Sequence, residues 1–290
     1  MEQRFDTLTF LSDYGLGDEF VGVVKSVVRS IAPGVTVVDL THDVPAFDVR
    51  AGGLTLARSA QYLCPGVVLA VVDPGVGTDR RAVAVEVGDG ASVLVGPDNG
   101  LLAPAVAMVG GATRVVELTD PRYRLDSPGA TFDGRDVFGP AAAHLCAGVP
   151  ITELGPEIDA TSLRPGLLPL SRVEDGVQLA DVLWVDRFGN CQLNLDPDEL
   201  DPATAKWRIT HRGRARNARR VRAFAELATG ELGLVLDSYG LLALAFDRSP
   251  AAEELDLAAG DQISLEPADD EPDAPDGPVT SPVTLRGMPR

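Results

Sequence analysis

The sequence predicts an α/β protein with a mostly parallel, Rossmann-like α/β/α sheet domain followed by a smaller antiparallel β domain. Two observations carry this prediction. Strand and helix signals alternate over the first 150 residues, and the strands are nearly continuous apolar runs such as Val67 to Val72, which is typical of strands buried on both faces. After residues 165–169 the helix periodicity weakens, and short β-type runs are separated by turn signals.

The N-terminal elements follow in order from these signals. Apolar residues from Phe20 to Ile31 recur on one helical face, and Pro33-Gly34 ends that helix. The sequence predicts strands at 8–11, 35–40, 67–72, 82–87 and 92–95, and helices at about 18–31, 49–63 and 137–147.

The C-terminal elements are shorter. The sequence predicts strands at 177–186, 191–195, 207–210, 233–237 and 241–246. We therefore expect an α/β domain over 1–168 and a β-rich domain over 172–266. Residues 267–290 are rich in acids and prolines and poor in large apolar residues, which predicts a disordered tail.

Composition excludes several classes of partner. The 290 residues include 25 basic and 43 acidic side chains, a net charge of −18, which argues against nucleic-acid and anionic-membrane binding. A run of arginines between Arg208 and Arg222 is therefore interpreted as a solvated loop or subunit contact. The sequence lacks a long apolar run and an N-terminal signal peptide, and its three cysteines are widely spaced. We expect a cytoplasmic protein with reduced thiols and without a metal site.

The turn after the apolar run 67–72 is the first candidate site. Asp73-Pro74-Gly75-Val76-Gly77 ends the run, and the turns bring Arg80 back beside Asp73. Ligands of open α/β sheets bind at the carboxyl ends of strands. Two interpretations stay open: a ligand site at the sheet edge, or an aspartate that caps its own backbone.

Other polar turns suggest the kind of ligand. Asp13 follows the first predicted strand, and Asp136 lies in a third polar turn. Carboxylates suit a ribose diol or a cation such as a sulfonium. In the second domain Asp186, Phe188 and Asn190 combine a carboxylate, a stacking face and an amide. The alternative is that these residues are ordinary caps and turns.

Six motifs, taken in order, resemble the SAM (S-adenosyl-L-methionine) hydroxide adenosyltransferases, which are relatives of the SAM-dependent fluorinase and chlorinase. They are Leu11-Ser12-Asp13-Tyr14-Gly15, Val38 to Val44, Val72 to Thr78, Gly96 to Leu101, Thr131-Phe132 with Gly134-Arg135-Asp136, and Asp186 with Phe188-Gly189-Asn190.

The resemblance implies a homotrimer that holds SAM between the sheet domain of one subunit and the barrel-like domain of the next. It implies attack of water or hydroxide on the ribose 5′ carbon, which releases adenosine and L-methionine without a further cofactor. By the same resemblance, Asp13 would bind the ribose, and Asp73 and Arg80 would be two members of a catalytic Asp-Arg-His triad. Asp186 and Ser238 would lie near methionine, and Asn190 would lie near the base. Phe246 and Arg248 would line the adenine pocket, partly through their backbone.

Two positions depart from the family pattern. Asp133 stands where the triad histidine is expected, and Ala243 stands where we expect an acidic residue. An ordinary aspartate is ionised near pH 7, whereas imidazole is able to donate or accept a proton there. The hypothesis is slow SAM hydrolysis. The alternatives are a SAM-dependent chlorinase, which the negative charge of Asp73 disfavours, and a catalytically weakened SAM- or adenosine-binding protein.

Overall fold

A computed structural model describes residues 4–166 and 169–268 of the chain. The chain divides into two compact units, with the boundary between residues 168 and 169, and each unit is described by itself. Of the predicted tail, Pro267 ends the last strand; residues 269–290 lie outside the described residues.

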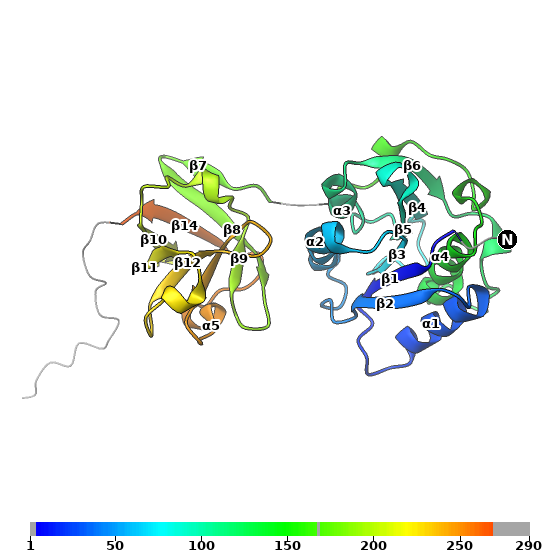
Figure 1. The fold of residues 1–290 in the computed structure, drawn as a ribbon, viewed down its shortest axis with the longest axis horizontal. Helices are drawn as coiled ribbons and strands as arrows, with labels where there is room; N and C mark the ends of the chain where they lie inside the picture. The colour runs from blue at the N-terminus through cyan, green and yellow to red at the C-terminus, as the bar shows by residue number, and fades with distance from the viewer. Residues whose placement is uncertain (1–3, 167–168, 269–290) are drawn as a thin grey trace, which may run out of the picture. The chain divides into compact units, whose positions relative to one another are not determined.

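The first unit is built on a mixed, mostly parallel sheet (Figure 1). Its strand order is β2-β1-β3-β5-β4-β6; the neighbours from β2 to β5 pair in parallel and β4 runs antiparallel to both β5 and β6. This confirms the predicted class. The strands are β1 Thr7–Ser12, β2 Thr36–Thr41, β3 Val67–Val71, β4 Ala82–Val87, β5 Ser92–Pro97 and β6 Ala112–Glu117.

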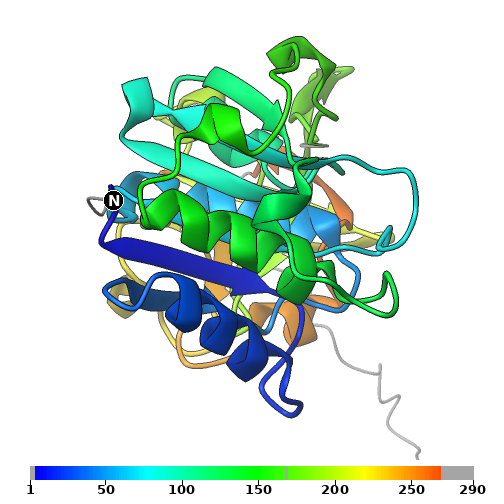
Figure 2. The same ribbon diagram turned by 90° about the vertical axis from the view of Figure 1, so that its right-hand side faces the viewer.

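Helices cover both faces of this sheet. Helices α1 and α4 pack side by side on one face, in front of the sheet in Figure 2, and α2 and α3 lie on the other. Val21, Val24 and Val28 of α1 are buried in the core, which is the apolar face that the periodicity predicts. The helices are α1 Phe20–Ile31, α2 Val49–Ser59, α3 Ala103–Met108, α4 Gly139–Cys146 and, in the second unit, α5 Ala251–Leu255.

The structure corrects the predicted helix at 137–147. A π-helical turn, Gly134–Phe138, precedes α4, so the helical segment begins earlier than the apolar pattern indicates. Helix α3 and strand β6 were not predicted. Helix α3 spans only six residues, and of the six residues of β6 only Val115 and Val116 are buried, so neither has a strong periodic signal.

The second unit is a β-barrel. Its strand order is β14-β10-β11-β12-β13-β9-β8, and pairing of β14 with β8 closes these seven strands within the described residues; β7 pairs on the outside with β8. This confirms the barrel-like domain. The strands are β7 Arg172–Glu174, β8 Val177–Val185, β9 Cys191–Leu193, β10 Lys206–His211, β11 Arg214–Val221, β12 Leu232–Leu236, β13 Leu242–Phe246 and β14 Gln262–Pro267.

The arginine-rich segment is a strand, not the solvated loop of the sequence interpretation. Strand β11 contains Arg214, Arg216, Arg219 and Arg220, and it pairs with β10 and β12. Ala218 of this strand is fully buried, while Arg219 pairs with Glu231 at 2.6 Å. By strand alternation Arg216 and Arg220 lie on the same face as the buried Ala218, so the sequence shows no regular apolar alternation, which explains why the strand was not predicted.

Within residues 4–166 and 169–268, none of the helices combines the length and the apolar character that crossing a membrane requires.

Candidate active site

The carboxyl ends of β1 and β3 form one edge of the first unit's sheet. The two strands are parallel neighbours, with Ser12 opposite Val71, so Asp13 and Asp73 follow them at the same edge. Both carboxylates line a cavity of about 460 Å³. Its wall consists of Asp13, Tyr14, Asp18, Phe20, Ala46, Phe47, Asp73, Val76, Thr131, Phe132, Asp133 and Gly134.

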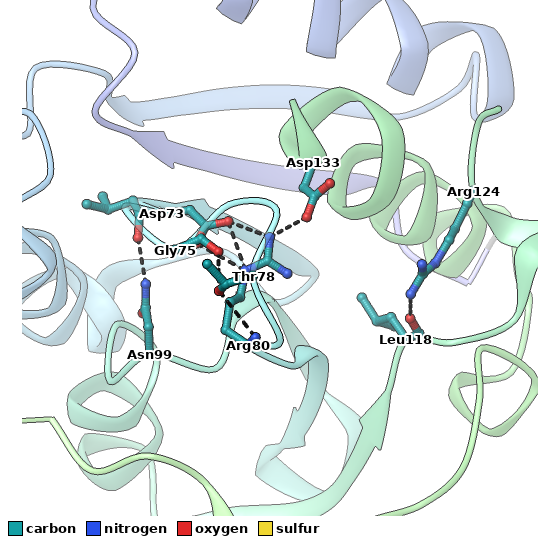
Figure 3. Close-up of polar contacts among 9 residues, drawn as sticks. Asp73, Gly75, Thr78, Arg80, Asn99, Leu118, Arg124 and Asp133 are labelled. Carbon is teal, nitrogen blue, oxygen red and sulfur yellow. Dashed lines mark hydrogen bonds and ion pairs between the residues drawn. The ribbon is translucent and has the colours of Figure 1, made fainter. Parts of the chain in front are cut away.

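The loop after β3 folds back on itself, as its glycines predict. Amide-to-carbonyl hydrogen bonds join Val76 to Asp73 at 3.2 Å and Thr78 to Gly75 at 3.1 Å, and the Thr78 hydroxyl donates to the Gly75 carbonyl at 2.6 Å. Gly77 has φ +77°, and a Cβ there would lie 2.8 Å from the Ala130 carbonyl oxygen, so this position requires glycine. The folded loop returns Arg80 to Asp73 (Figure 3).

Arg80 joins two carboxylates that are far apart in the sequence (Figure 3). Its Nε lies 3.1 and 3.0 Å from the two oxygens of Asp73, its Nη2 lies 2.6 Å from Asp73 Oδ2, and Nη2 also donates to Asp133 Oδ2. The exposed fractions of the side chains are 10% for Arg80, 6% for Asp73 and 15% for Asp133. The guanidinium also lies over the Phe138 ring, 5.1 Å from its centroid. We call these three residues the Arg80 cluster.

The Arg80 cluster carries one cation and two carboxyl groups. Burial alone would lower the pKa of Arg80, but the hydrogen bonds and charges of Asp73 and Asp133 outweigh burial and raise that pKa above its ordinary value. Arg80 is therefore a permanent cation. Together with Asp13, the cluster gives this part of the cavity wall an excess of carboxyl groups, which favours a cationic ligand.

Tyr14 belongs to the same wall, and sequence analysis gave it no role. Its ring packs against Phe20 and Phe132, with centroids 5.8 and 5.6 Å away. Burial, and then the charges of Asp13, Asp73 and Asp133, raise the pKa of Tyr14 above its ordinary value, so it stays a neutral phenol. Its position directly after Asp13 in a polar turn was the available signal.

Gly134 makes room for Tyr14. A Cβ at Gly134 would lie 2.1 Å from the Tyr14 hydroxyl oxygen, closer than van der Waals contact permits. The glycine next to Asp133 is therefore needed for the observed position of the phenol. The motif contained this glycine, but nothing in the sequence indicated its partner.

Asp13 is held by a backbone donor from the loop after β2. Its Oδ2 accepts a hydrogen bond from the Phe47 amide at 2.9 Å. Phe47 has φ +67° and an exposed ring, an uncommon conformation for a bulky residue. Phe47 is another wall residue to which sequence analysis gave no role. Asp48, which caps α2 by accepting from the Ala51 amide, was the only local signal.

In the second unit, Asp186, Phe188 and Asn190 form one turn between β8 and β9. Asp186 Oδ1 accepts from the amides of Phe188 and Asn190 at 2.8 and 2.9 Å, and Oδ2 accepts from Asn190 Nδ2 at 2.8 Å. The Phe188 ring is exposed. The aspartate therefore shapes its own turn, as the alternative interpretation states, and leaves an aromatic face open to solvent.

The other candidate residues of the second unit lie along β13. Phe246 ends this strand with its side chain in the barrel core, so a ligand would meet mainly its backbone. Arg248 follows with φ +57° and an exposed side chain. Ser238 is exposed in the turn that precedes β13, at the opposite end of the strand. Ala243 is buried within β13, opposite Gln192.

Several polar residues of the motifs maintain the fold of the first unit instead of facing the cavity. The Asp136 carboxylate pairs with its neighbour Arg135 at 2.6 Å. Asn99 Nδ2 donates to the Val72 carbonyl at 2.8 Å. His144, which lies on α4 outside the motifs, packs against the Tyr123 ring at 5.0 Å, and burial lowers its pKa.

Among the residues that the structure describes, no group of three or more His, Cys, Asp or Glu side chains is arranged to hold a metal ion.

Comparison with known proteins defines the class. Residues 8–155 match the SAM hydroxide adenosyltransferase N-terminal domain, and residues 180–264 match the C-terminal domain of the same family. These two matches span both units. The chain belongs to the SAM hydroxide adenosyltransferase family.

Individual relatives agree with this assignment. An (R)-S-adenosyl-L-methionine hydrolase of Salinispora tropica is 43% identical over 258 residues, which cover 89% of this chain and 97% of the relative. A fluorinase of Actinoplanes sp. is more distant, with 27% identity over 89% of this chain and 96% of the relative. The crystal structure of an uncharacterized conserved protein from Thermotoga maritima superposes with a TM-score of 0.82 at 32% identity, covering 89% of this chain and 99% of that one.

Proposed function

We propose that this protein hydrolyses SAM to adenosine and L-methionine at the Arg80 cluster. The observation that carries the proposal is the contact of Asp73 and Asp133 with one arginine at the wall of a cavity, at the carboxyl ends of β1 and β3. Membership of the SAM hydroxide adenosyltransferase family and the 43% identity to a SAM hydrolase support the same reaction.

In the proposed reaction a water oxygen attacks the ribose 5′ carbon in line with the carbon–sulfur bond. That bond breaks, its electron pair goes to sulfur, and methionine leaves as a neutral thioether. The water proton passes to a carboxylate of the cluster and then to solvent. A sulfonium is already a good leaving group, so the protein has to orient and partly deprotonate a poor nucleophile. We propose that no cofactor takes part, because SAM itself supplies the activated group.

Asp73 and Arg80 are proposed to act directly on the nucleophile. A carboxylate held by three guanidinium contacts keeps a fixed orientation, and its oxygens accept the hydrogen of a bound water. Asp133 is proposed as the third catalytic group, in the place of the family's histidine. Since two carboxylates repel an incoming anion, neutral water is favoured over chloride, which weakens the chlorinase alternative.

Asp133 also provides the reason to expect slow turnover. An aspartate that is occupied by Arg80 is a poorer proton acceptor near pH 7 than a neutral imidazole. If the family's histidine contributes general-base catalysis, its replacement costs roughly 10² to 10⁴ in rate. The remaining alternative is a protein that binds SAM or adenosine without turnover.

We propose that substrate binding uses both units, the second supplied by the next subunit of a homotrimer. Asp13 would bind the ribose hydroxyls, Asp186 and Ser238 would lie near methionine, and Asn190 would lie near the base. The rings of Phe47 and Phe188 are exposed. Such rings support a surface that another subunit covers, or a ring that stacks on the substrate. Phe246 and Arg248 would line the adenine pocket, Phe246 through its backbone. The three free cysteines support a cytoplasmic location.

The configuration of the substrate's sulfur is part of the proposal. The Salinispora tropica relative is named a hydrolase of (R)-S-adenosyl-L-methionine, and a sulfonium with three different substituents is a stereocentre. The two epimers point the methionine chain in different directions from the same reacting carbon. We therefore propose that the (R) epimer is hydrolysed faster.

The test is incubation of the purified protein with each SAM epimer in ¹⁸O-labelled water, with and without chloride, followed by mass analysis of the nucleosides. We expect adenosine labelled at the 5′ oxygen, and faster from the (R) epimer. Chlorinated nucleoside would establish the chlorinase alternative. Binding of SAM without product would establish the binding protein, and equal rates for both epimers would contradict the stereochemical part alone.

A further inference from the structure

A buried histidine lies behind the cavity wall, in a motif that the proposed reaction does not use. His42 follows β2, its side chain is almost fully buried, and its Nδ1 lies 2.8 Å from the Ser12 hydroxyl oxygen. On the other side of the ring, Nε2 lies 3.1 Å from Asp39 Oδ1, and Lys25 Nζ lies 2.5 Å from Asp39 Oδ2. A chain of polar contacts therefore runs from the surface to the end of β1.

A bulge in β2 makes this arrangement possible. Phe10 pairs with Asp39, but the next residue, Leu11, pairs with Thr41, so Leu40 is an extra residue in β2. In a regular strand, residues three apart point to opposite faces. The extra residue brings Asp39 and His42 to the same side, where the ring reaches both Asp39 and Ser12.

Hydrogen-bond directions along the chain follow from the chemistry of its members. Burial would raise the pKa of Asp39, but the hydrogen bonds from Lys25 and His42 outweigh burial and lower that pKa; the ionised carboxylate only accepts, so His42 Nε2 carries the hydrogen. In the neutral ring Nδ1 is then an acceptor, and the Ser12 hydroxyl donates to it. The Ser12 oxygen in turn accepts from the Tyr14 amide at 3.3 Å.

The backbone of His42 holds the same turn from its other end. The Gly15 amide donates to the His42 carbonyl at 2.8 Å. His42 thus holds residues 12 to 15 at two points, and the residues between those points are Asp13 and Tyr14, both in the cavity wall. The contacts of Ser12, His42 and Asp39 are not a second nucleophilic site, because Ser12 is fully buried and its oxygen is out of reach of a substrate.

We propose that His42 is a positioning residue that, through Ser12, fixes the turn carrying Asp13 and Tyr14 against the cavity. Its consequence for activity rests on the proposed function, since Asp13 is proposed to bind the ribose. Its consequence for the turn does not, because the hydrogen bonds exist without substrate. Loss of the Ser12–His42 contact frees the turn, and loss of the Asp39 contact alone does not.

Two substitutions of His42 separate the two contacts. His42→Asn places an amide oxygen near the position of Nδ1 and keeps an acceptor for Ser12, but it cannot reach Asp39. His42→Gln places its amide near the position of Nε2 and keeps a donor for Asp39, but it leaves Ser12 without its acceptor. Ser12→Ala removes the contact from the other side, and His144→Gln is the matched control on a histidine that packs away from the cavity.

The first readout is hydrogen exchange of the Tyr14 and Gly15 amides in the full-length protein without substrate. We expect at least tenfold faster exchange in His42→Gln and Ser12→Ala, and exchange within about threefold of wild type in His42→Asn and His144→Gln. At a pH at which the wild-type ring is neutral, its ¹⁵N signature should be that of the Nε2–H tautomer. Similar exchange in His42→Asn and His42→Gln, or the other tautomer, would overturn the proposal.

The second readout is adenosine formation from SAM. We expect His42→Gln and Ser12→Ala to raise the KM at least tenfold with a smaller change in kcat. We expect His42→Asn to keep the KM near the wild-type value. An equal loss of kcat and stability in all His42 variants would show a merely structural role. If the wild-type protein forms no adenosine, the proposed function fails, and the exchange experiment still decides the positioning role.

Discussion

Two adjacent arginines differ in the roles that we propose for them: Arg80 in the reaction and Arg81 in the fold. Arg80 contacts two carboxylates, Asp73 and Asp133, and its side chain is 10% exposed at the cavity wall. Arg81 contacts one carboxylate, with its Nε 2.9 Å from Asp98 Oδ2, and its Nη1 donates to the Ser162 hydroxyl at 3.0 Å. Its side chain is 28% exposed. The two arginines directly precede β4, and consecutive side chains of an extended segment point to opposite sides.

The difference between the two arginines is their charge balance. One cation faces one anion at Arg81, where Asp98 also accepts the Arg164 amide at 2.8 Å, so the group joins β4, the end of β5 and the segment 162–164. At Arg80 one guanidinium contacts two carboxyl groups, so its single positive charge does not neutralise both. A second carboxyl group beside the same guanidinium is not an arrangement that stability alone favours, but it would attract a sulfonium, which fits the reaction proposed for this cavity.

The largest expected effect comes from removing the charge of Asp73. We predict that Asp73→Asn lowers kcat for adenosine formation by roughly 10⁴, the upper range for loss of a group that orients and deprotonates the nucleophile. The matched control is Asp98→Asn beside Arg81. This variant should lower the Tm, because Arg81 loses the largely buried carboxylate with which it forms an ion pair. It should keep kcat within about threefold of wild type. Equal loss of kcat in both variants would contradict the separate roles.

The second prediction concerns the surplus carboxylate. We expect Asp133→His to raise kcat by at least about 10², because a neutral imidazole at this position both relieves the repulsion with Asp73 and accepts a proton near pH 7. The pH dependence of kcat should gain an acidic limb near the ordinary histidine pKa of about 6.5. Asp133→Asn is the control, since it removes the charge without adding a base. If it gives the same increase as Asp133→His, general-base catalysis is not the reason.

The sequence predicted the features that depend on residues close together along the chain, and it did not predict those that depend on contacts between distant residues. Apolar runs predicted the strands of the first sheet. Val67 to Val71 are all buried, and a continuous apolar run indicates such a strand without knowledge of which strands lie beside it. The turn at Asp73 was readable because its glycines and Arg80 are close in sequence. Strand β11 was missed because arginines interrupt the apolar alternation on both of its faces, and its burial depends on partners on both sides in a closed barrel.

The rest of the candidate site depends on contacts between distant segments. The contact of Asp133 with Arg80 spans 53 residues, and family resemblance, not local pattern, indicated it. The approach of Tyr14 to Gly134 and the hydrogen bond from Ser12 to His42 have no local signal at all. The hydrogen bond between Ser12 and His42 needs the extra residue at Leu40, and a leucine within a strand is not a sequence signal of a bulge.

The third prediction tests the fit between Tyr14 and the turn that carries Asp133. Since a Cβ at Gly134 would lie 2.1 Å from the Tyr14 hydroxyl oxygen, Gly134→Ala must displace the phenol or the Asp133 turn. A misplacement of about 1 Å costs up to roughly 10² in kcat/KM, so we expect a loss of roughly 10 to 10². Gly22→Ala on α1, where a Cβ meets nothing within 4 Å, should keep kcat/KM and slightly raise the Tm. Unchanged kinetics in Gly134→Ala would contradict the requirement for glycine.

The smallest effect is expected from Tyr14 itself, which lines the same cavity wall as Asp73 and Asp133. Burial and the charges of Asp13, Asp73 and Asp133 raise the pKa of Tyr14 above its ordinary value of 10. A group with a raised pKa keeps its proton as the pH rises to 10, so Tyr14 should add no alkaline limb to the pH dependence of kcat/KM between pH 6 and 10. Tyr14→Phe should therefore give a profile of the same shape, lowered less than about tenfold by loss of one hydroxyl group. A wild-type profile that falls below pH 10, with a fall that disappears in Tyr14→Phe, would show that the phenol ionises easily and would contradict its burial beside these carboxylates.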